Sequence, residues 1–337
     1  MLYITTKDQK DAHTAHKTLM SDCAADGGLY IPMRLPAYTA EEILKLKERS
    51  FSDVVAQILN YFFSARLTAW DVDFAIGRNP LKTVSLGRKI VISELWHNPD
   101  AAYKGLEKNL FRRLSQNGGI AAVPTDWARI AIRIAVLFGV YGELRRNGIL
   151  IVNQKFDLAV DVGEYFAPVA AVYAKEMGLP VGKILCCCGS ENGAVWDLIH
   201  RNDMSTATLT PQLRLGLERL LYVLYGESEM RRFAEACDKK RSYSVEEENQ
   251  EKLTDTLFCV VVGQERLNAV VNSVYRTDNY LIDLNTALPF GAIQDYRSKA
   301  GETIVTLLFA ERDPALSVQA IMKATGMSRD AFYKLIK

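Results

Sequence analysis

The chain has 337 residues, of which 49% are hydrophobic and 24% are charged, and this composition is typical of a globular protein rather than a disordered one. Its 41 Lys and Arg residues almost balance its 40 Asp and Glu residues, so no overall charge favours nucleic acid or an anionic membrane. The segment Met1–Asp8 lacks the basic and apolar regions of a signal peptide, and no apolar segment is long enough to span a bilayer. We therefore expect a cytoplasmic protein without membrane contact.

Residues 1–85 predict a mainly helical amino-terminal domain. A short strand is expected over Leu29–Pro32, directly after a glycine-rich turn. Thr39 begins a capping box and Thr68 marks a second helix start, because each is followed three residues later by an acidic side chain. Between them, residues 52–63 carry apolar side chains at helical spacing, which predicts a further helix.

Residues 86–337 follow a different pattern, in which short apolar strands alternate with helices. Such alternation predicts an α/β sheet with helices on both faces. The helix expected over residues 126–146 is apolar on most sides, so we expect it to be buried. The charged segment 238–252 is expected to be a solvated loop or an exposed helix surface. The expected strands include Ile90–Ile92, Leu158–Val160, Ile184–Cys186 and Leu257–Val261.

Three consecutive cysteines occupy positions 186–188. Neighbouring residues of a strand point to opposite faces, and no second pair of Cys or His follows at a usable distance. The sequence therefore predicts a buried strand with Cys as a small apolar residue, and no metal site.

The segment Glu94–Lys104, which reads ELWHNPDAAYK, is the most informative motif of the chain. It resembles the E-L-x-H-G-P-x-x-A-F-K-D segment of threonine synthases, whose lysine forms a Schiff base with pyridoxal phosphate. Five further segments resemble motifs of that family and follow in family order. The resemblance implies a type II pyridoxal phosphate enzyme fold, similar to tryptophan synthase β: an α/β sheet with helices on both faces beside a helical amino-terminal domain. The five segments are Cys23–Pro32, Thr125–Arg129, Ala174–Pro180, Leu217–Leu221 and Tyr280–Ala287.

Only twenty residues separate Lys104 from Thr125, where the family places a whole small domain. The resemblance therefore implies that the small domain, with the loop that holds the substrate carboxylate, is missing. Ser115–Gly119 is the nearest segment rich in serine and glycine, and we interpret it as the junction left by the deletion. Loss of this domain would expose the cofactor ring to water, which active sites of this kind exclude.

The resemblance also assigns the candidate site residues. Lys104 is the candidate catalytic residue, as the Schiff-base lysine. His97 is a candidate cofactor contact. Arg129, in the Thr125–Arg129 block, and Asn285, which replaces the family histidine of D-P-H-T-A, are candidate substrate contacts.

Two candidate cofactor contacts depart from the family pattern. Gly163 is the one glycine left of the G-N-F-G-D phosphate loop, in which Glu164 adds a negative charge and Phe166 adds bulk. Glu311 stands near the hydroxyl residue that meets the pyridine nitrogen in the family, and a surface position beside Arg312 is the simpler interpretation. We expect this loop to have stopped binding phosphate, and pyridoxal phosphate is the cofactor if there is one.

These departures favour a catalytically degenerate threonine synthase-like protein, a pseudoenzyme or scaffold that binds a protein partner or forms a homodimer. The alternative is an active pyridoxal phosphate-dependent lyase that converts O-phosphohomoserine to threonine, or acts on another small amino acid. A second alternative comes from Ser317–Lys334, which resembles half of a helix-turn-helix motif and would present Arg329, Tyr333 and Lys334 to DNA. The absence of a basic excess argues against nucleic acid.

Overall fold

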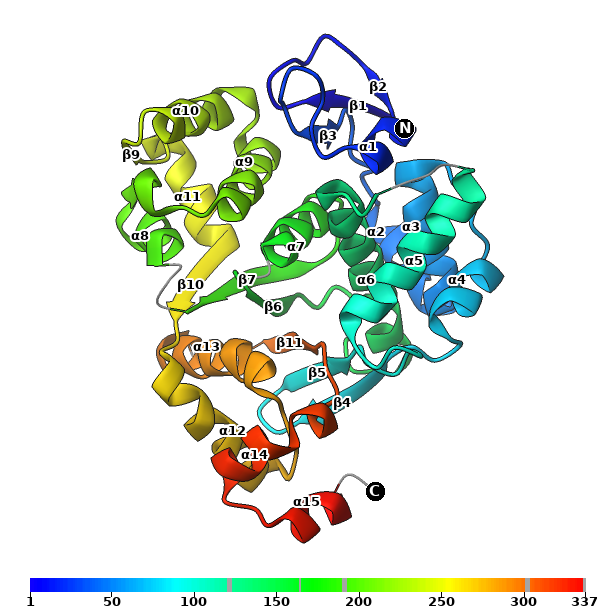
Figure 1. The fold of residues 1–337 in the computed structure, drawn as a ribbon, viewed down its shortest axis with the longest axis vertical. Coiled ribbons are helices and arrows are strands. Elements are labelled where there is room, and N and C mark those ends of the chain that lie inside the picture. Colours follow the sequence, from blue (N-terminus) through cyan, green and yellow to red (C-terminus); the bar gives the residue numbers. More distant parts are fainter. Residues whose placement is uncertain (120–122, 164, 190–192, 301–303, 336–337) are drawn as a thin grey trace.

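A computed structural model describes residues 1–119, 123–163, 165–189, 193–300 and 304–335. At its centre lies a six-stranded sheet with the strand order β10-β7-β6-β11-β5-β4 (Figure 1). Neighbouring strands are parallel, except that the edge strand β4 is antiparallel to β5. The predicted α/β sheet is therefore confirmed. Its strands are β4 (Lys82–Leu86), β5 (Ile90–Glu94), β6 (Phe156–Asp161), β7 (Val181–Cys188), β10 (Leu257–Val261) and β11 (Val305–Ala310).

Helices cover both faces of this sheet, as predicted. Helices α6 (Asp126–Arg146) and α7 (Phe166–Glu176) lie on one side, and α12 (Gln264–Asp278) and α13 (Leu284–Ala300) lie on the other (Figure 1). The buried residues of each strand divide between two hydrophobic cores, one on each side, as the two-residue period of a strand requires. No helix in the described part of the chain is both long enough and apolar enough to cross a bilayer.

The three consecutive cysteines end strand β7 and are buried, as predicted. Cys186 and Cys188 belong to the core around α6 and α7, whereas Cys187 belongs to the core around α12 and α13. Burial raises the pKa of the Cys186 thiol well above its ordinary value, so it stays protonated at neutral pH. Among the described residues, no group of three or more His, Cys, Asp or Glu side chains could hold a metal ion.

The amino-terminal part packs directly on helix α6. Trp127 of α6 lies between Tyr3, Phe62 and Tyr173, with ring centroids 5.4–5.8 Å apart, and its indole N–H donates to the Tyr3 hydroxyl at 3.0 Å. One continuous core therefore joins this part to the large sheet, and the division at residues 85 and 86 stays a prediction. The elements here are β1 (Leu2–Thr5), β2 (His13–Thr14), α1 (Ala15–Met20), β3 (Tyr30–Pro32), α2 (Ala40–Lys45), η1 (Leu46–Glu48), α3 (Phe51–Phe63) and α4 (Ala69–Ile76).

Both predicted helix starts are capping boxes. In each, the threonine side chain accepts from the backbone of the acidic residue, and the acidic side chain accepts from the threonine backbone. Asp71 of the second box also accepts a hydrogen bond from Arg113 Nε at 2.9 Å. This contact ties α4 to the neighbouring helix α5 (Tyr103–Gly118).

Asp71 predicts a pH dependence of stability. Burial by itself raises the pKa of this carboxyl, but hydrogen bonds from Thr68 and Arg113 outweigh burial and lower the pKa to about 2. Because the unfolded pKa is about 3.9, the ionised carboxylate stabilises the fold above that pH, and this contribution is lost as the pH falls toward 2. We expect Asp71→Asn to lower the free energy of unfolding at neutral pH. In urea unfolding, its difference from the wild type should shrink between pH 4 and pH 2, and a difference independent of pH would contradict this account.

Helices α5 and α6 follow one another closely, with only residues 119–125 between them. Thr125 caps α6, which begins and ends where the sequence predicts and is buried along most of its length. The interpretation of Ser115–Gly119 as the junction left by a deletion stays a prediction, but the structure shows its local conformation. Ser115 to Gly118 form the last turn of α5, and Gly119 closes that helix with a φ of 63°.

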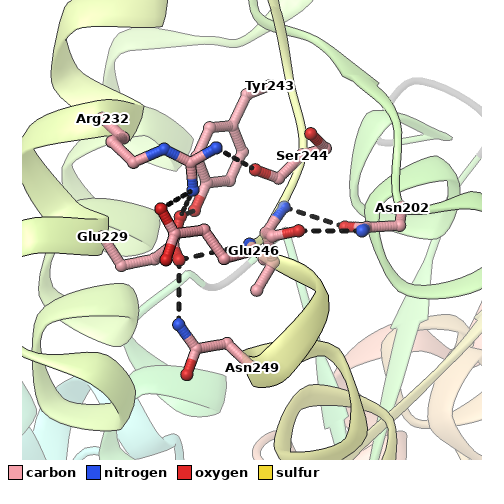
Figure 2. Close-up of polar contacts among 8 residues, drawn as sticks. Asn202, Glu229, Arg232, Tyr243, Ser244, Glu246 and Asn249 are labelled. Atoms are coloured by element: carbon pink, nitrogen blue, oxygen red, sulfur yellow. Dashed lines mark hydrogen bonds and ion pairs between the residues drawn. The ribbon is translucent and has the colours of Figure 1, made fainter.

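A helical unit is inserted between β7 and β10. Its elements are α8 (Gly193–Arg201), β8 (Met204–Ser205), η3 (Thr206–Thr208), α9 (Pro211–Tyr225), α10 (Glu227–Asp238), β9 (Ser242–Tyr243) and α11 (Glu247–Thr256). The buried Glu229 carboxylate accepts hydrogen bonds from Arg232, Tyr243, the Glu246 backbone and Asn249, and so joins α10 to the segment that leads into α11 (Figure 2).

This network corrects one expectation. The segment 238–252 is not wholly solvated, because Tyr243 and Val245 are buried within the helical unit. The charged side chains that dominate the segment do lie on its outside: Glu246, Glu247 and Glu248 are exposed.

The carboxyl-terminal segment forms η4 (Pro314–Ser317), α14 (Val318–Thr325) and α15 (Arg329–Leu335), with Gly326 in a left-handed turn between the two helices. The predicted helix, turn and helix are therefore present. Ile321 and Phe332 are buried in a small cluster with Leu281, and α14 packs on α12. The two helices therefore form a hairpin that packs on the rest of the protein. DNA binding by this segment stays a prediction.

Candidate functional site

A cavity of about 370 Å³ lies at the carboxyl ends of β6 and β11. After β6 the chain continues to β7 on one side, whereas β11 and β5 lie on the other side, so this is the point where the strand order reverses. Open α/β sheets bind ligands at such a point. The cavity is lined by Ala102, Tyr103, Lys104, Arg133, Ala159, Val160, Asp161, Ala167, Asn285, Thr286, Pro289, Phe309, Glu311, Arg312, Leu316 and Ser317.

The sheet fixes the backbone that carries Lys104. The Leu95 N–H donates to the Ala310 carbonyl at 2.9 Å, and the Tyr103 N–H donates to the Glu311 carbonyl at 2.8 Å. Between these two anchors, the Asn98 amide donates to two carbonyls of its own loop. Lys104 follows as the second residue of α5, lines the cavity and is exposed to solvent.

An ion pair between the buried Arg133 and the half-buried Glu311 forms one wall of the cavity. The Arg133 guanidinium lies 2.9 Å from Glu311 Oε1 and 4.3 Å from the centre of the Tyr103 ring. Burial alone would lower the pKa of Arg133, but the Glu311 carboxylate, together with Tyr103 and Glu107, outweighs burial and holds that pKa above its ordinary value. The expectation that Glu311 occupies a surface position is therefore wrong, because a residue of α6 holds its side chain in the cavity wall.

His97 lies outside the residues that line the cavity. Its Nε2 is 2.6 Å from Glu94 Oε2, and the Tyr280 hydroxyl donates to Glu94 Oε1 at 2.6 Å. Burial, followed by the Glu94 carboxylate, raises the pKa of Tyr280 well above its ordinary value, so its hydroxyl remains a donor. Through these contacts, Glu94 at the end of β5 links Tyr280 to His97, which lies in the loop between β5 and α5.

Arg129 and Gly163 also lie away from the cavity lining. The Arg129 side chain pairs with Glu107 at 3.1 Å and lies over the Phe166 ring at 5.4 Å. The Gly163 N–H donates to Asp161 Oδ1 at 2.8 Å. Glu164, the negative charge expected beside it, lies outside the described residues.

Three of the six predicted site residues therefore share one cavity: Lys104, Asn285 and Glu311. Arg133 and Asp161 were not predicted as site residues, although Arg133 is the one charged residue within the apolar stretch 130–140 and could have been noticed for that reason. The roles of all these residues stay predictions.

Comparison with known proteins finds similar chains among the threonine synthases. Residues 2–78 match the family model described as Threonine synthase N terminus. A threonine synthase of Pseudomonas aeruginosa is 22% identical, and the alignment covers 96% of this chain and 90% of that protein. The chain is similar to the threonine synthases. That alignment extends over 441 residues, more than the 337 of this chain, so it includes gaps in this chain.

Other relatives extend the comparison. Human Threonine synthase-like 1 is 24% identical over 175 residues, which cover 48% of this chain and 23% of that protein. This chain thus spans less than a quarter of the length of that relative.

The fold of the chain is similar to that of solved threonine synthases. A pyridoxal phosphate-bound threonine synthase from Brucella melitensis has a TM-score of 0.77 at 17% identity, and the match covers 97% of this chain and 92% of that one. The yeast threonine synthase also has a TM-score of 0.77, at 16% identity, with 99% of this chain and 91% of that one covered. These matches establish a type II pyridoxal phosphate enzyme fold.

Proposed function

We propose that this protein is a catalytically degenerate threonine synthase relative, which keeps the enzyme scaffold but does not use pyridoxal phosphate in catalysis. The first turn of α7 carries the proposal. It follows β6, where the family phosphate loop leads into a helix whose free N–H groups would meet the phosphate. Here Phe166 begins the helix and is buried, and Pro168 lacks an N–H. The residues of this turn do not fit a phosphate group.

The state of Lys104 supports the same proposal. A Schiff-base lysine reacts as a neutral amine, and proteins usually obtain that form by burial or a nearby cation. Lys104 is instead exposed to solvent. Glu311, the residue nearest to the expected partner of the ring nitrogen, is already paired with Arg133. The position of Lys104 in the cavity supports descent from an enzyme of this family. The exposure of Lys104 and the pairing of Glu311 with Arg133 argue against present use of the cofactor.

A scaffold of this kind acts by binding another molecule, and a protein partner or a second copy of the chain is part of the proposal. Trp70 and Phe74 of α4 support it. Both aromatic rings are largely exposed and stacked with centroids 5.3 Å apart, and the Arg113 guanidinium lies 5.3 Å from each. Exposed aromatic side chains beside arginine are common at the centre of protein interfaces.

An absorbance spectrum with added pyridoxal phosphate tests the loss of cofactor use. We expect any band from lysine-bound cofactor to be removed by dialysis, and to be equally strong in the wild type and in Lys104→Ala. Lys108→Ala is the matched control, because Lys108 is an exposed lysine one turn further along the same helix. Since the Lys104 side chain is exposed, we expect its removal to leave the thermal unfolding midpoint nearly unchanged.

A stable absorbance band that depends on Lys104 is the outcome that would contradict the proposal. A band that survives dialysis in the wild type and in Lys108→Ala, but is absent from Lys104→Ala, would contradict the proposal. It would favour the active lyase and justify an assay with O-phosphohomoserine. Lys104, Asn285 and Glu311 in one cavity are the observation that keeps this alternative open.

A further inference from the structure

A second groove, of about 350 Å³, lies at the opposite end of the sheet from the Lys104 cavity. It includes Ile90, the first residue of β5, whereas the Lys104 cavity lies beyond the carboxyl ends of the strands. Helices α12 and α13 and the turn between β4 and β5 form its walls. It is lined by Gly87, Arg88, Ile90, Ser273, Val274, Thr277, Asp278, Phe290, Ile293, Gln294, Arg297 and Ser298.

The groove has an apolar floor. Ile90, Val274, Phe290 and Ile293 all line it, and each is buried in the core beneath α12 and α13. Small-molecule sites in proteins are mostly apolar concave surfaces of about 300–1,000 Å³ with a few polar groups at defined positions. The volume and the floor of the groove meet this description.

Its polar side is built on a fixed turn. Arg88 and Lys89 have φ values of 58° and 57°, a left-handed conformation that side chains other than glycine seldom adopt. Two contacts hold the turn: the Gly87 N–H donates to Asp278 Oδ1 at 3.1 Å, and the buried Arg297 guanidinium donates to the Arg88 and Lys89 carbonyls. Arg88 lies at the groove because the turn adopts this strained backbone conformation.

Two opposite charges on this groove indicate its ligand. Arg88 is exposed on the turn, and Asp278 is half-buried at the end of α12. The buried Arg297 guanidinium lies beside them and donates to the backbone carbonyls of Arg88, Lys89 and Ile304. A carboxylate is the ligand group that suits an arginine, and an ammonium group suits an aspartate.

We propose that this groove binds a free α-amino acid with an apolar side chain. The carboxylate faces Arg88, the ammonium group faces Asp278, and the apolar side chain covers Ile90, Val274 and Phe290. The site is separate from the Lys104 cavity, so its existence does not depend on the degenerate character proposed for that cavity. It makes the protein a receptor for a small amino acid at a place other than the family active site.

Isothermal titration of the full chain with L-phenylalanine tests the proposal. N-acetyl-L-phenylalanine lacks the ammonium group and L-phenylalaninamide lacks the carboxylate, and we expect each analogue to bind about tenfold more weakly or worse than L-phenylalanine. Asp278→Asn should weaken L-phenylalanine about tenfold but leave the N-acetyl analogue unaffected. Arg88→Gln should weaken L-phenylalanine similarly but leave the amide unaffected.

Two control variants locate the site. Lys89→Gln changes the same turn at a residue that does not line the groove, and Arg312→Gln changes the lining of the Lys104 cavity. Both are expected to bind L-phenylalanine as the wild type does. Asp278→Asn keeps an acceptor for the Gly87 N–H, and circular dichroism of each variant confirms that it is folded. No binding of L-phenylalanine to the wild type at millimolar concentration, or equal binding by Asp278→Asn and Arg88→Gln, would overturn the proposal.

Discussion

Replacing Glu229 by alanine is expected to lower the free energy of unfolding by about 3 kcal/mol, because the buried Tyr243 hydroxyl and the Asn249 amide would lose their shared acceptor. Glu229 is 2% exposed and lies 2.5 Å from Arg232 and 2.8 Å from the Tyr243 hydroxyl. Burial, followed by the Glu229 carboxylate, raises the pKa of Tyr243 well above its ordinary value, so the hydroxyl donates throughout the neutral range. The loss would loosen the helical unit between β7 and β10 first.

Equilibrium unfolding in urea measures this effect, with Glu235→Ala as the control. Glu235 belongs to the same helix, and its fully exposed carboxylate pairs with Lys239 one turn away. We expect its removal to leave the stability almost unchanged, since exposed ion pairs contribute little. Equal losses in the two variants would show that the buried network does not stabilise the unit.

Gly178→Ala is expected to be the second severe substitution, with a loss of at least about 3 kcal/mol. Gly178 ends helix α7 with a φ of 104°, and a Cβ atom there would lie 2.6 Å from the Tyr38 carbonyl oxygen. The Gly178 N–H donates to the Lys175 carbonyl, and the Leu179 N–H donates to the Ala174 carbonyl. This is the Schellman pattern, in which a left-handed residue closes the helix. In this protein the Tyr38 backbone also lies close to Gly178, so there is no room for a Cβ atom.

Gly326→Ala is the matched control for Gly178→Ala. Gly326 also ends a helix in the left-handed region, with a φ of 68°, but no heavy atom of the described residues lies within 4 Å of the position that its Cβ would take, its own chain neighbours apart. We expect a loss of only about 1 kcal/mol, from the backbone conformation alone. Urea midpoints of the two variants separate the conformational contribution from the contact with Tyr38. Similar losses would contradict the close contact.

Local signals in the sequence predicted local structure well. The boundaries of α6, the two capping boxes and the buried strand with three cysteines all depend on residues within a few positions of one another. The hydrogen bonds of a helix start and the two-residue alternation of a strand are short-range by nature. The central strand β11, however, was not among the strands expected from the sequence.

The candidate site was predicted in part. The family motifs placed Lys104 and Asn285 on one cavity, although 180 residues separate them, because homology carries information about the tertiary fold. His97, which pairs with Glu94, and Arg129, which pairs with Glu107, do not line this cavity, and their roles stay predictions. A motif identifies the position that corresponds to a family residue, but the surrounding side chains in the folded protein decide where that residue's side chain points.

The sequence by itself determined the family, the alternation of strands and helices, and the closeness of Lys104 to Thr125, since each of these is carried by neighbouring residues. Only the tertiary structure decided that Arg133 pairs with Glu311 across 178 positions, and that Arg88 and Asp278 share a groove at the far end of the sheet. Parallel strands are joined through long crossover connections, so the residues that meet at a sheet edge come from distant parts of the chain. No local pattern records such pairs, because their geometry exists only after the strands have taken their order.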